Sequence, residues 1–356
     1  MNSPRALRTT ELAKEFARQG HQVTVLVPKV EEHFEFEKEY NLQIKDLGHV
    51  RWSGVTLKGK GIGLLTRRFI RRFSKLLFEF PDIQLFGLVT RALKKESEYD
   101  MLVSVAVPYP IHWGVAASRN KYHPIAKTWV ADCGDPYMGH KNDTFRRPFY
   151  FKWVEKWFCR KADFISVPFP GAKEAYYPEF REKIRVIPQG FSFPEIVKNV
   201  DKKKSRECVA FAYSGNIGSY KHYAIPFLQE LENVNAAFEF YIYTREFDFW
   251  QRHCSPKLQE KCIIRSYLER GKLLHVLSEM DFLLHFPYEL DVQKSLKLID
   301  YQYLNIPILS YRNTEADKIK LNEYLNWNFD RRGLREDISQ YKIENVTKQF
   351  LNLTLH

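Results

Sequence analysis

The chain has 356 residues, of which 44% are hydrophobic and 28% charged, and its formal net charge is +12 at pH 7. This globular composition has no apolar run near the roughly 20 residues that cross a bilayer, and its five scattered cysteines lack the pairing of a disulfide or zinc framework. The length predicts two domains, and the positive charge indicates an anionic partner: a nucleic acid, a membrane surface or a phosphorylated substrate.

The first half of the chain predicts alternating helices and strands. An apolar stripe through Leu7, Leu12 and Phe16 indicates a helix that stops at Gly20, and QVTVLVP follows as a buried strand. Further β-branched runs are DMLVSVAVP, AKTWVADCGDP, ADFISVPF and KIRVIPQGF. Strands separated by helical lengths are typical of βαβ units around a parallel sheet. Such a domain usually begins with a strand, so we expect one upstream of the first helix.

Within this half, residues 51–80 hold eight Lys/Arg against one Glu and predict a basic amphipathic helix. Its apolar face would carry Leu65, Phe69, Phe73, Leu76, Leu77 and Phe80, and its basic face Arg67, Arg68, Arg71, Arg72 and Lys75. An aromatic, basic helix of this kind indicates an interfacial membrane element. The alternative is a helix that packs on its own core and exposes the basic face. Residues 146–161 show a similar mixture.

The second half repeats the alternation. CVAFAYSGNIG, FEFYIYT, CIIRSYL and DFLLHF predict strands, while PFLQELENV and KLLHVLSEM predict helices. The polar segment 192–207 is the predicted linker. We therefore predict an α/β protein with two doubly wound, Rossmann-like domains, 1–191 and 208–330, that face each other across a cleft. A helical segment, 331–356, could return to the first domain.

The stretch DVQKSLKLIDYQYLNIPILSY predicts a helix that Asn305 and Pro307 end before a short buried strand. Lys297 and Asp300 lie one turn apart near the start of this helix. Such a pair is commonly an ordinary surface ion pair. At the start of a helix that follows a parallel strand, the same residues could instead hold an anion.

Five segments, in order, resemble the GT-B glycosyltransferases, specifically the retaining bacterial enzymes numbered family 4. They are RALRTTELAKEFARQGHQVTVL, WVADCGDPY, KIRVIPQGF, AYSGNIG and SEMDFLLHFPYELDVQKSLKLIDYQYLNIPIL. The last contains the pattern K-x-x-(E/D)-Y-x-x-x-x-x-P. The resemblance covers nearly the whole chain and implies a GT-B fold whose C-terminal domain binds a nucleotide-sugar donor.

For the donor diphosphate, the resemblance points to the helix start at Ser295 and to Lys297, and for the ribose diol to Asp300. Gly215 would allow the backbone to approach a phosphate, with Lys221 as the cation of this loop. Three assignments depart from the family pattern or have a plain alternative. Asn216 replaces the arginine that often follows the glycine, Glu289 lies only near the place of the first motif glutamate, and Arg8 could be an ordinary surface arginine.

For catalysis, the resemblance points to Asp132 and Asp135 at a strand exit of the first domain. Asp135 would contact the sugar near its reacting carbon and stabilise positive charge there, or act as a base in an inverting reaction. The alternative is a turn at Asp135 and a cap at Asp132. His112 is a further candidate, although a lone histidine among aromatic residues is commonly structural. We expect no metal site, because no Asp-x-Asp triplet or ligand spacing appears.

The sequence therefore predicts a glycosyltransferase that moves a sugar from a nucleotide-sugar donor to a saccharide or lipid-linked acceptor in cell-surface polysaccharide synthesis, with retention. It would need no cofactor, bind no nucleic acid, and lie in the cytoplasm on the inner face of the cell membrane. The alternatives are a nucleotide-sugar epimerase of the same fold and a non-catalytic nucleotide-sugar-binding protein. Specificity for the base, sugar and acceptor lies in loop geometry that the sequence does not reveal.

Overall fold

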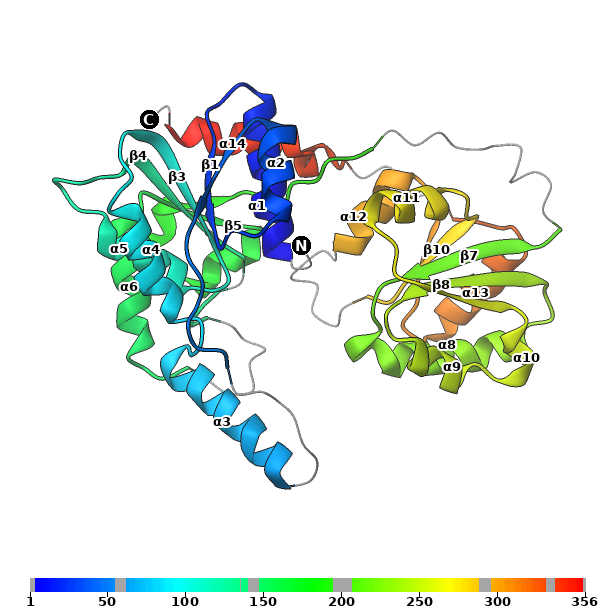
Figure 1. Ribbon diagram of the computed structural model, residues 1–356. Coiled ribbons are helices and arrows are strands. Elements are labelled where there is room, and N and C mark those ends of the chain that lie inside the picture. The colour runs from blue at the N-terminus through cyan, green and yellow to red at the C-terminus, as the bar shows by residue number, and fades with distance from the viewer. Residues whose placement is uncertain are drawn as a thin grey trace. The chain divides into compact units, whose positions relative to one another are not determined.

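The computed structural model describes residues 4–54, 62–134, 136–139, 147–194, 207–287, 296–330 and 337–354. The chain divides into two compact units (Figure 1). Unit 1 contains Met1–Ser192 and Gln340–His356, and unit 2 contains Phe193–Ser339. Both units are built from parallel strands joined by helices, which confirms the predicted fold class.

Unit 1 has a four-stranded parallel sheet in the order β3-β4-β5-β6 and a two-stranded parallel pair, β1-β2. In chain order its elements are α1 (Pro4–Arg18), β1 (Thr24–Val27), α2 (Glu32–Tyr40), β2 (Gln43–Asp46), α3 (Ile62–Phe78), α4 (Gln84–Leu93), β3 (Tyr99–Ala106), α5 (Pro110–Ser118), β4 (Ala126–Cys133), α6 (Phe151–Lys161), β5 (Phe164–Val167), η1 (Pro170–Ala175), η2 (Pro178–Lys183), β6 (Ile184–Val186), α14 (Ile343–Leu351) and η5 (Asn352–Thr354). Strand β4 is buried along almost its whole length, as expected of a parallel strand inside a sheet.

The C-terminal helix α14 packs on the first helix of the same unit. Val346 and Phe350 of α14 share a buried cluster with Leu12 and Phe16 of α1, and the carbonyl of Phe191 accepts the N–H of Ile343 at 3.0 Å. The amphipathic pattern of α14 is thereby explained, because its apolar stripe completes the core of unit 1 rather than that of unit 2.

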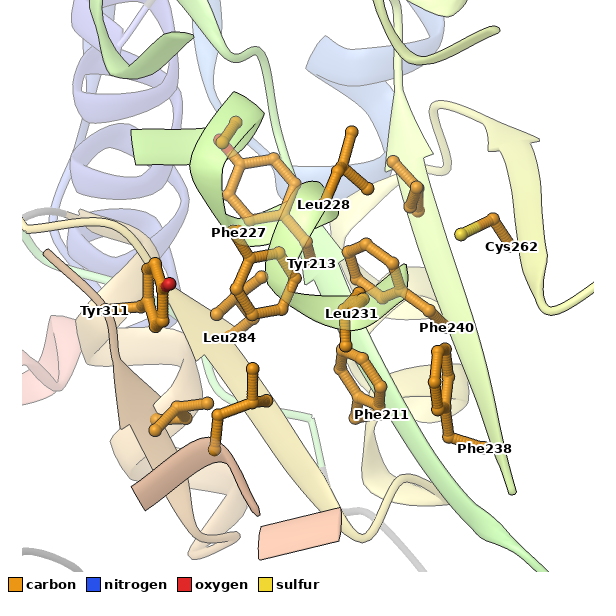
Figure 2. Close-up of a cluster of buried hydrophobic side chains, with 14 of the residues drawn as sticks. Phe211, Tyr213, Phe227, Leu228, Leu231, Phe238, Phe240, Cys262, Leu284 and Tyr311 are labelled. Carbon is orange, nitrogen blue, oxygen red and sulfur yellow. The ribbon is translucent and has the colours of Figure 1, made fainter. Parts of the chain in front are cut away.

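Unit 2 has a five-stranded parallel sheet in the order β11-β10-β7-β8-β9. In chain order its elements are β7 (Val209–Ser214), η3 (Gly218–Tyr220), α8 (Lys221–Asn233), β8 (Phe238–Thr244), α9 (Phe247–His253), α10 (Pro256–Gln259), β9 (Cys262–Ser266), α11 (Arg270–Ser278), β10 (Phe282–His285), α12 (Leu296–Leu304), β11 (Ile308–Ser310) and α13 (Glu315–Leu325), with η4 (Ser339–Tyr341) at the boundary between the units. Its main core is aromatic (Figure 2). Phe211 of β7 stacks on Phe240 and Phe282 of the neighbouring strands, with ring centroids 4.6 Å and 4.5 Å apart.

Two local details bear on the sequence predictions. Helix α12 ends at Leu304 as predicted, because Asn305 takes a positive φ of 52° and Pro307 follows. Helix α8 begins at Lys221, five residues before the predicted PFLQELENV, so Pro226 lies inside the helix. In the described part of the chain, no helix has the length and apolarity to cross a membrane.

Candidate functional site

The carboxyl edge of the unit 2 sheet is the natural place for a ligand, because loops at this edge leave backbone groups free to bind. Three described segments reach it: the glycine loop that starts at Gly215 after β7, the turn at Glu246 after β8, and the end of β10 at His285. Helix α12, which begins at Leu296, then leads into β11. Of the predicted donor residues, Gly215 and Asn216 lie in the glycine loop, and Lys297 and Asp300 lie on α12.

Gly215 and Lys297 lie against each other. Gly215 has a φ of +115°, which side chains disfavour, and its N–H donates to the carbonyl of Tyr243 at 2.8 Å. A Cβ at this position would lie 3.1 Å from Nζ and 3.2 Å from Cε of Lys297. The backbone angle therefore favours glycine here, and a Cβ would also displace the end of the lysine side chain. The structure brings together the two residues that the sequence assigned to the diphosphate.

The ammonium of Lys297 has an aromatic neighbour but no acidic one in the described chain. It lies 4.0 Å from the ring centroid of Tyr213, and none of the ion pairs between described residues includes it. Burial lowers the pKa of Lys297 from 10.5 to about 7. An anion that binds beside this partly buried cation would offset the cost of burying its charge.

Two residues that the sequence did not predict hold the glycine loop in shape. The hydroxyl of Tyr301 accepts the N–H of Ser214 at 3.1 Å and lies 3.1 Å from Ser214 Oγ, which anchors the end of β7 to α12. The carboxylate of Glu246 accepts the N–H groups of Ile217 and Gly218. The loop is thus fixed from both sides before any ligand binds.

Asp300, predicted to bind the ribose, is paired with Arg270 of α11. Nη2 of Arg270 donates to Oδ1 of Asp300 at 2.6 Å. Burial raises the pKa of Asp300, and the charge and hydrogen bonds of Arg270 act against this rise. The carboxylate therefore has a fixed partner and orientation. Arg270 was missed because it lies 30 residues away along the chain.

The remaining predicted donor residues are less closely gathered. Lys221 is exposed, and its ammonium lies 5.6 Å from the ring centroid of Phe249 on the α9 side of the loop. There it borders a cavity of about 630 Å³ that is also lined by Ile225, Arg245, Glu246, Phe247, Asp248, Phe249, Arg252 and His253. Asn216 is exposed, and its carbonyl accepts the hydroxyl of Tyr213 at 2.9 Å. Glu289 and Ser295 lie outside the described residues.

In unit 1, Asp132 and Arg8 form a buried pair, which differs from both predicted roles. The carboxylate of Asp132 accepts Nε and Nη2 of Arg8 at 2.6 Å and 2.7 Å and the hydroxyl of Ser166 at 2.6 Å. Arg8 also donates to the carbonyl of Pro188 at 2.7 Å. Burial would raise the pKa of Asp132, but Arg8 and its other partners hold it below its ordinary value. Asp132 is therefore a poor base, and Arg8 is committed to unit 1 rather than to phosphates.

A second arginine, which the sequence did not single out, lies at the same strand end and is partly exposed. Nη1 of Arg5 lies 3.3 Å from Oδ2 of Asp132, and the Arg5 side chain is 21% exposed. A Cβ on Gly134 would overlap the Arg5 guanidinium, so this close approach depends on the glycine. The next residue, the candidate Asp135, lies outside the described residues.

His112 lies in the unit 1 core, which agrees with the structural alternative for this residue rather than with a catalytic role. Its side chain is fully buried, with Nδ1 2.8 Å from Ser104 Oγ and Nε2 3.4 Å from Cys133 Sγ. Burial lowers the pKa of His112 to about 3. Both ring nitrogens are occupied inside the core, which leaves no access for a substrate.

The basic helix α3 exposes the first half of its predicted apolar face, whereas Leu76, Leu77 and Phe80 are half-buried. The alternative of a core-packed helix therefore describes only the C-terminal end of this face. Phe69, Phe73 and Phe78 are 67%, 49% and 63% exposed, and Leu65 is 63% exposed. The predicted basic residues Arg67, Arg68, Arg71 and Arg72 are exposed as well. Lys75 differs, because its ammonium pairs with Glu79 at 2.7 Å and Asp82 at 2.5 Å.

Comparisons with known proteins agree on the family and the architecture. The sequence model described as Glycosyltransferase Family 4 matches residues 6–192, and no curated protein sequence matches the chain. Among solved structures, a glycosyltransferase from Rickettsia africae ESF-5 has a TM-score of 0.63 at 12% identity over 99% of this chain and 95% of that one.

Two further structures share the fold. HepE from Anabaena in complex with UDP has a TM-score of 0.60 at 11% identity over 99% of this chain and 96% of that one. UDP-GlcNAc 2-epimerase from Neisseria meningitidis bound to UDP-GlcNAc has a TM-score of 0.56 at 12% identity over 99% of this chain and 97% of that one. At such low identities these likenesses establish the GT-B fold alone.

Groups of three or more His, Cys, Asp or Glu side chains that could hold a metal do not occur among the described residues.

Proposed function

The chain belongs to Glycosyltransferase Family 4, and we propose that unit 2 binds a nucleotide-sugar donor through Lys297, the glycine loop and Asp300. The acceptor in this proposal is a saccharide or a lipid-linked saccharide used in cell-surface polysaccharide synthesis. The observation that carries the proposal is the position of the Lys297 ammonium, 3.1 Å from where a Cβ on Gly215 would lie and without a carboxylate partner in the described chain. The phosphates of a donor would supply the missing negative charge.

We propose that the reaction proceeds with retention, as the family resemblance implies. The bond between the anomeric carbon and the diphosphate oxygen breaks, and the acceptor oxygen forms its bond on the same face. The acceptor proton passes to the departing phosphate oxygen, so no base from the protein is needed. This route fits unit 1, where Asp132 is occupied by Arg8. Lys297 would stabilise the charge of the leaving diphosphate, and the proposal invokes no metal.

A thermal-shift screen with UDP-, GDP-, ADP- and dTDP-sugars and the free diphosphates tests donor binding. At a hundredfold excess over Kd, a ligand should stabilise the wild-type protein by about 2.7 kcal/mol. Lys297→Met should abolish the shift while leaving the ligand-free protein at least as stable, because it removes an uncompensated buried charge. Lys318→Met is the matched control, since Lys318 forms an exposed ion pair with Glu315 at 2.7 Å. A full shift in the Lys297 variant would refute the assignment.

We also propose that α3 docks the protein on an anionic membrane on the cytoplasmic side, near a lipid-linked acceptor. Four exposed arginines accompany the exposed aromatic residues of this helix. The hydroxyl of Tyr150 donates to the carbonyl of Leu77, which places the exposed Phe149 and Trp153 beside the end of α3. Each basic residue near an anionic leaflet contributes about 1 kcal/mol, and the aromatic rings suit the interface.

Flotation with phosphatidylglycerol and with pure phosphatidylcholine vesicles tests this docking. The wild-type protein should float with the anionic vesicles, and Phe69→Ser with Phe73→Ser should reduce the floated fraction several-fold. Phe34→Ser is the matched control, because Phe34 is 61% exposed on α2 and lies outside α3. Equal flotation of all three proteins would count against the α3 surface.

The epimerase alternative shares the fold, as the Neisseria structure illustrates. An epimerase acts on a free nucleotide sugar and releases no nucleoside diphosphate, whereas a transferase releases one for each sugar transferred. Product analysis with a lipid-linked acceptor therefore separates them. The exposed apolar surface of α3 favours the transferase, because an enzyme that acts on a soluble substrate does not need an apolar surface for membrane binding.

A further inference from the structure

Arg270 is bonded asymmetrically to the carboxylate of Asp300. Its Nη2 and Nε lie 2.6 Å and 3.1 Å from Oδ1, whereas the contact from Nε to Oδ2 is 3.3 Å. The guanidinium thus engages Oδ1 most closely and fixes the plane of the carboxylate. Oδ2 has the longest of these contacts and the better capacity to accept further hydrogen bonds.

Arg270 is itself held by an aromatic layer. Its guanidinium lies 5.1 Å from the ring centroid of Phe193. That ring packs against Tyr303 in a tilted arrangement, with centroids 4.5 Å apart and an interplanar angle of 31°. The hydroxyl of Tyr303 donates to the carbonyl of Pro194. We call Arg270, Phe193 and Tyr303 the Arg270 clamp. It joins the start of α11, the first residue of unit 2, and α12.

The clamp suits a positioning role better than a stabilising one. The Arg270 and Asp300 side chains are mostly buried but keep 24% and 19% of their surface exposed, which leaves room for a ligand to reach the carboxylate. A planar guanidinium stacked on a ring has few orientations left, so it imposes one direction on the carboxylate. Lys297, three residues before Asp300, lies on the same helix turn, so a ligand at Lys297 is within reach of that carboxylate.

We propose that Arg270 is a positioning residue for the ribose of the bound nucleotide. By engaging Oδ1, it directs Oδ2 of Asp300 toward the ribose diol, and the Phe193 ring keeps the guanidinium in that orientation. This inference rests on the proposed donor site, and it adds a residue that acts through Asp300 without contacting the donor. It predicts that Arg270 affects the recognition of the diol specifically.

Calorimetric titration of UDP and its 2′-deoxy analogue dUDP into the full chain tests the proposal. If the thermal-shift screen selects another base, the pair ADP and dADP or the pair GDP and dGDP replaces them. The wild-type protein should bind the ribonucleotide about tenfold more tightly, since a hydrogen bond to a charged group is worth about 1.5 kcal/mol. In Arg270→Lys, which keeps the charge but not the planar fork, the preference should fall below about threefold while the deoxynucleotide affinity stays unchanged. Phe193→Leu, which keeps the ion pair but removes the stacked ring, should give an intermediate preference.

Arg185→Lys is the matched control, because Arg185 is exposed and its guanidinium lies 5.0 Å from the Phe164 ring centroid, remote in sequence from the donor residues. It should bind both nucleotides like the wild type. An unchanged preference in Arg270→Lys would overturn the inference and leave the donor site standing. Equal weakening of both nucleotides would show a merely structural role and also overturn it. A wild-type protein that binds no nucleoside diphosphate would overturn the proposed function, and this inference with it.

Discussion

Because the pKa of Lys297 is lowered, we expect the affinity for the donor to fall as the pH rises above 7. Burial lowers this pKa to about 7 in the empty site. A bound diphosphate favours the charged ammonium and returns the pKa toward its ordinary value. Above pH 7 the ligand must therefore bind together with a proton, and affinity falls as pH rises. For a pKa of 7, the protonated fraction drops from about one half at pH 7 to about 0.01 at pH 9, a roughly 50-fold loss of affinity or about 2.3 kcal/mol.

Titration calorimetry of UDP between about pH 7 and pH 9 measures this effect, because the terminal phosphate, with its pKa near 6, is already ionised there. Repeating the titration in buffers of different ionisation enthalpy should reveal uptake of about 0.9 proton at pH 8. His285 does not account for this uptake, since burial, Lys297 and Arg312 lower its pKa to about 4 and leave it neutral in this range. Lys297→Met should bind weakly with a flat profile, and Lys318→Met should follow the wild type. A parallel decline in wild type and Lys297→Met would refute the reasoning.

Three further predictions concern the rest of the chain. Asp132→Asn should lower the free energy of unfolding by about 3–5 kcal/mol in urea denaturation, because it leaves Arg8 charged and buried without its carboxylate; a loss below about 1 kcal/mol would contradict the pairing. Gly215→Ala should abolish the nucleoside diphosphate thermal shift, because the Cβ meets Lys297 and the positive φ adds about 1–2 kcal/mol of strain; an undiminished shift would contradict the contact. Flotation on anionic vesicles should fall steeply between about 0.05 M and about 0.5 M salt, because screening removes the contribution of the α3 arginines; salt-independent flotation would contradict their role.

The elements of the fold were predictable because local patterns determine them. A buried run such as the one that forms β4 can be recognised from a few consecutive residues. Residues that end a helix, such as Asn305 and Pro307, likewise act on their immediate neighbours in the chain. Helix α8 shows that local patterns predict the presence of a helix better than the residue at which it begins. The predicted helical run PFLQELENV begins with Pro226, but the helix itself begins at Lys221, so the proline lies inside it.

The candidate site was only partly predictable, because its partners come from distant segments. The meeting of Lys297 with Gly215 was foreseen through the resemblance. Arg270 and Glu246 were not, since neither has a local pattern that marks it. The pairing of Arg8 with Asp132 spans 124 positions, and it gave both residues a role different from the predicted one. Likewise, the periodicity of α3 indicates an apolar face but does not reveal whether another element covers it.

The buried charges of Asp132 and Lys297 differ in whether the protein itself pairs them. In unit 1, the buried Asp132 and Arg8 are paired with each other, and Ser166 also donates to the carboxylate, so a ligand would have to break existing bonds to reach either charge. In unit 2, the Lys297 ammonium lies over the Tyr213 ring and beside Gly215, and it forms no ion pair with a carboxylate of the described residues. Keeping such a cation partly buried costs stability unless something else supplies the anion. That deficit is a physical reason, independent of the family resemblance, to place the diphosphate beside Lys297.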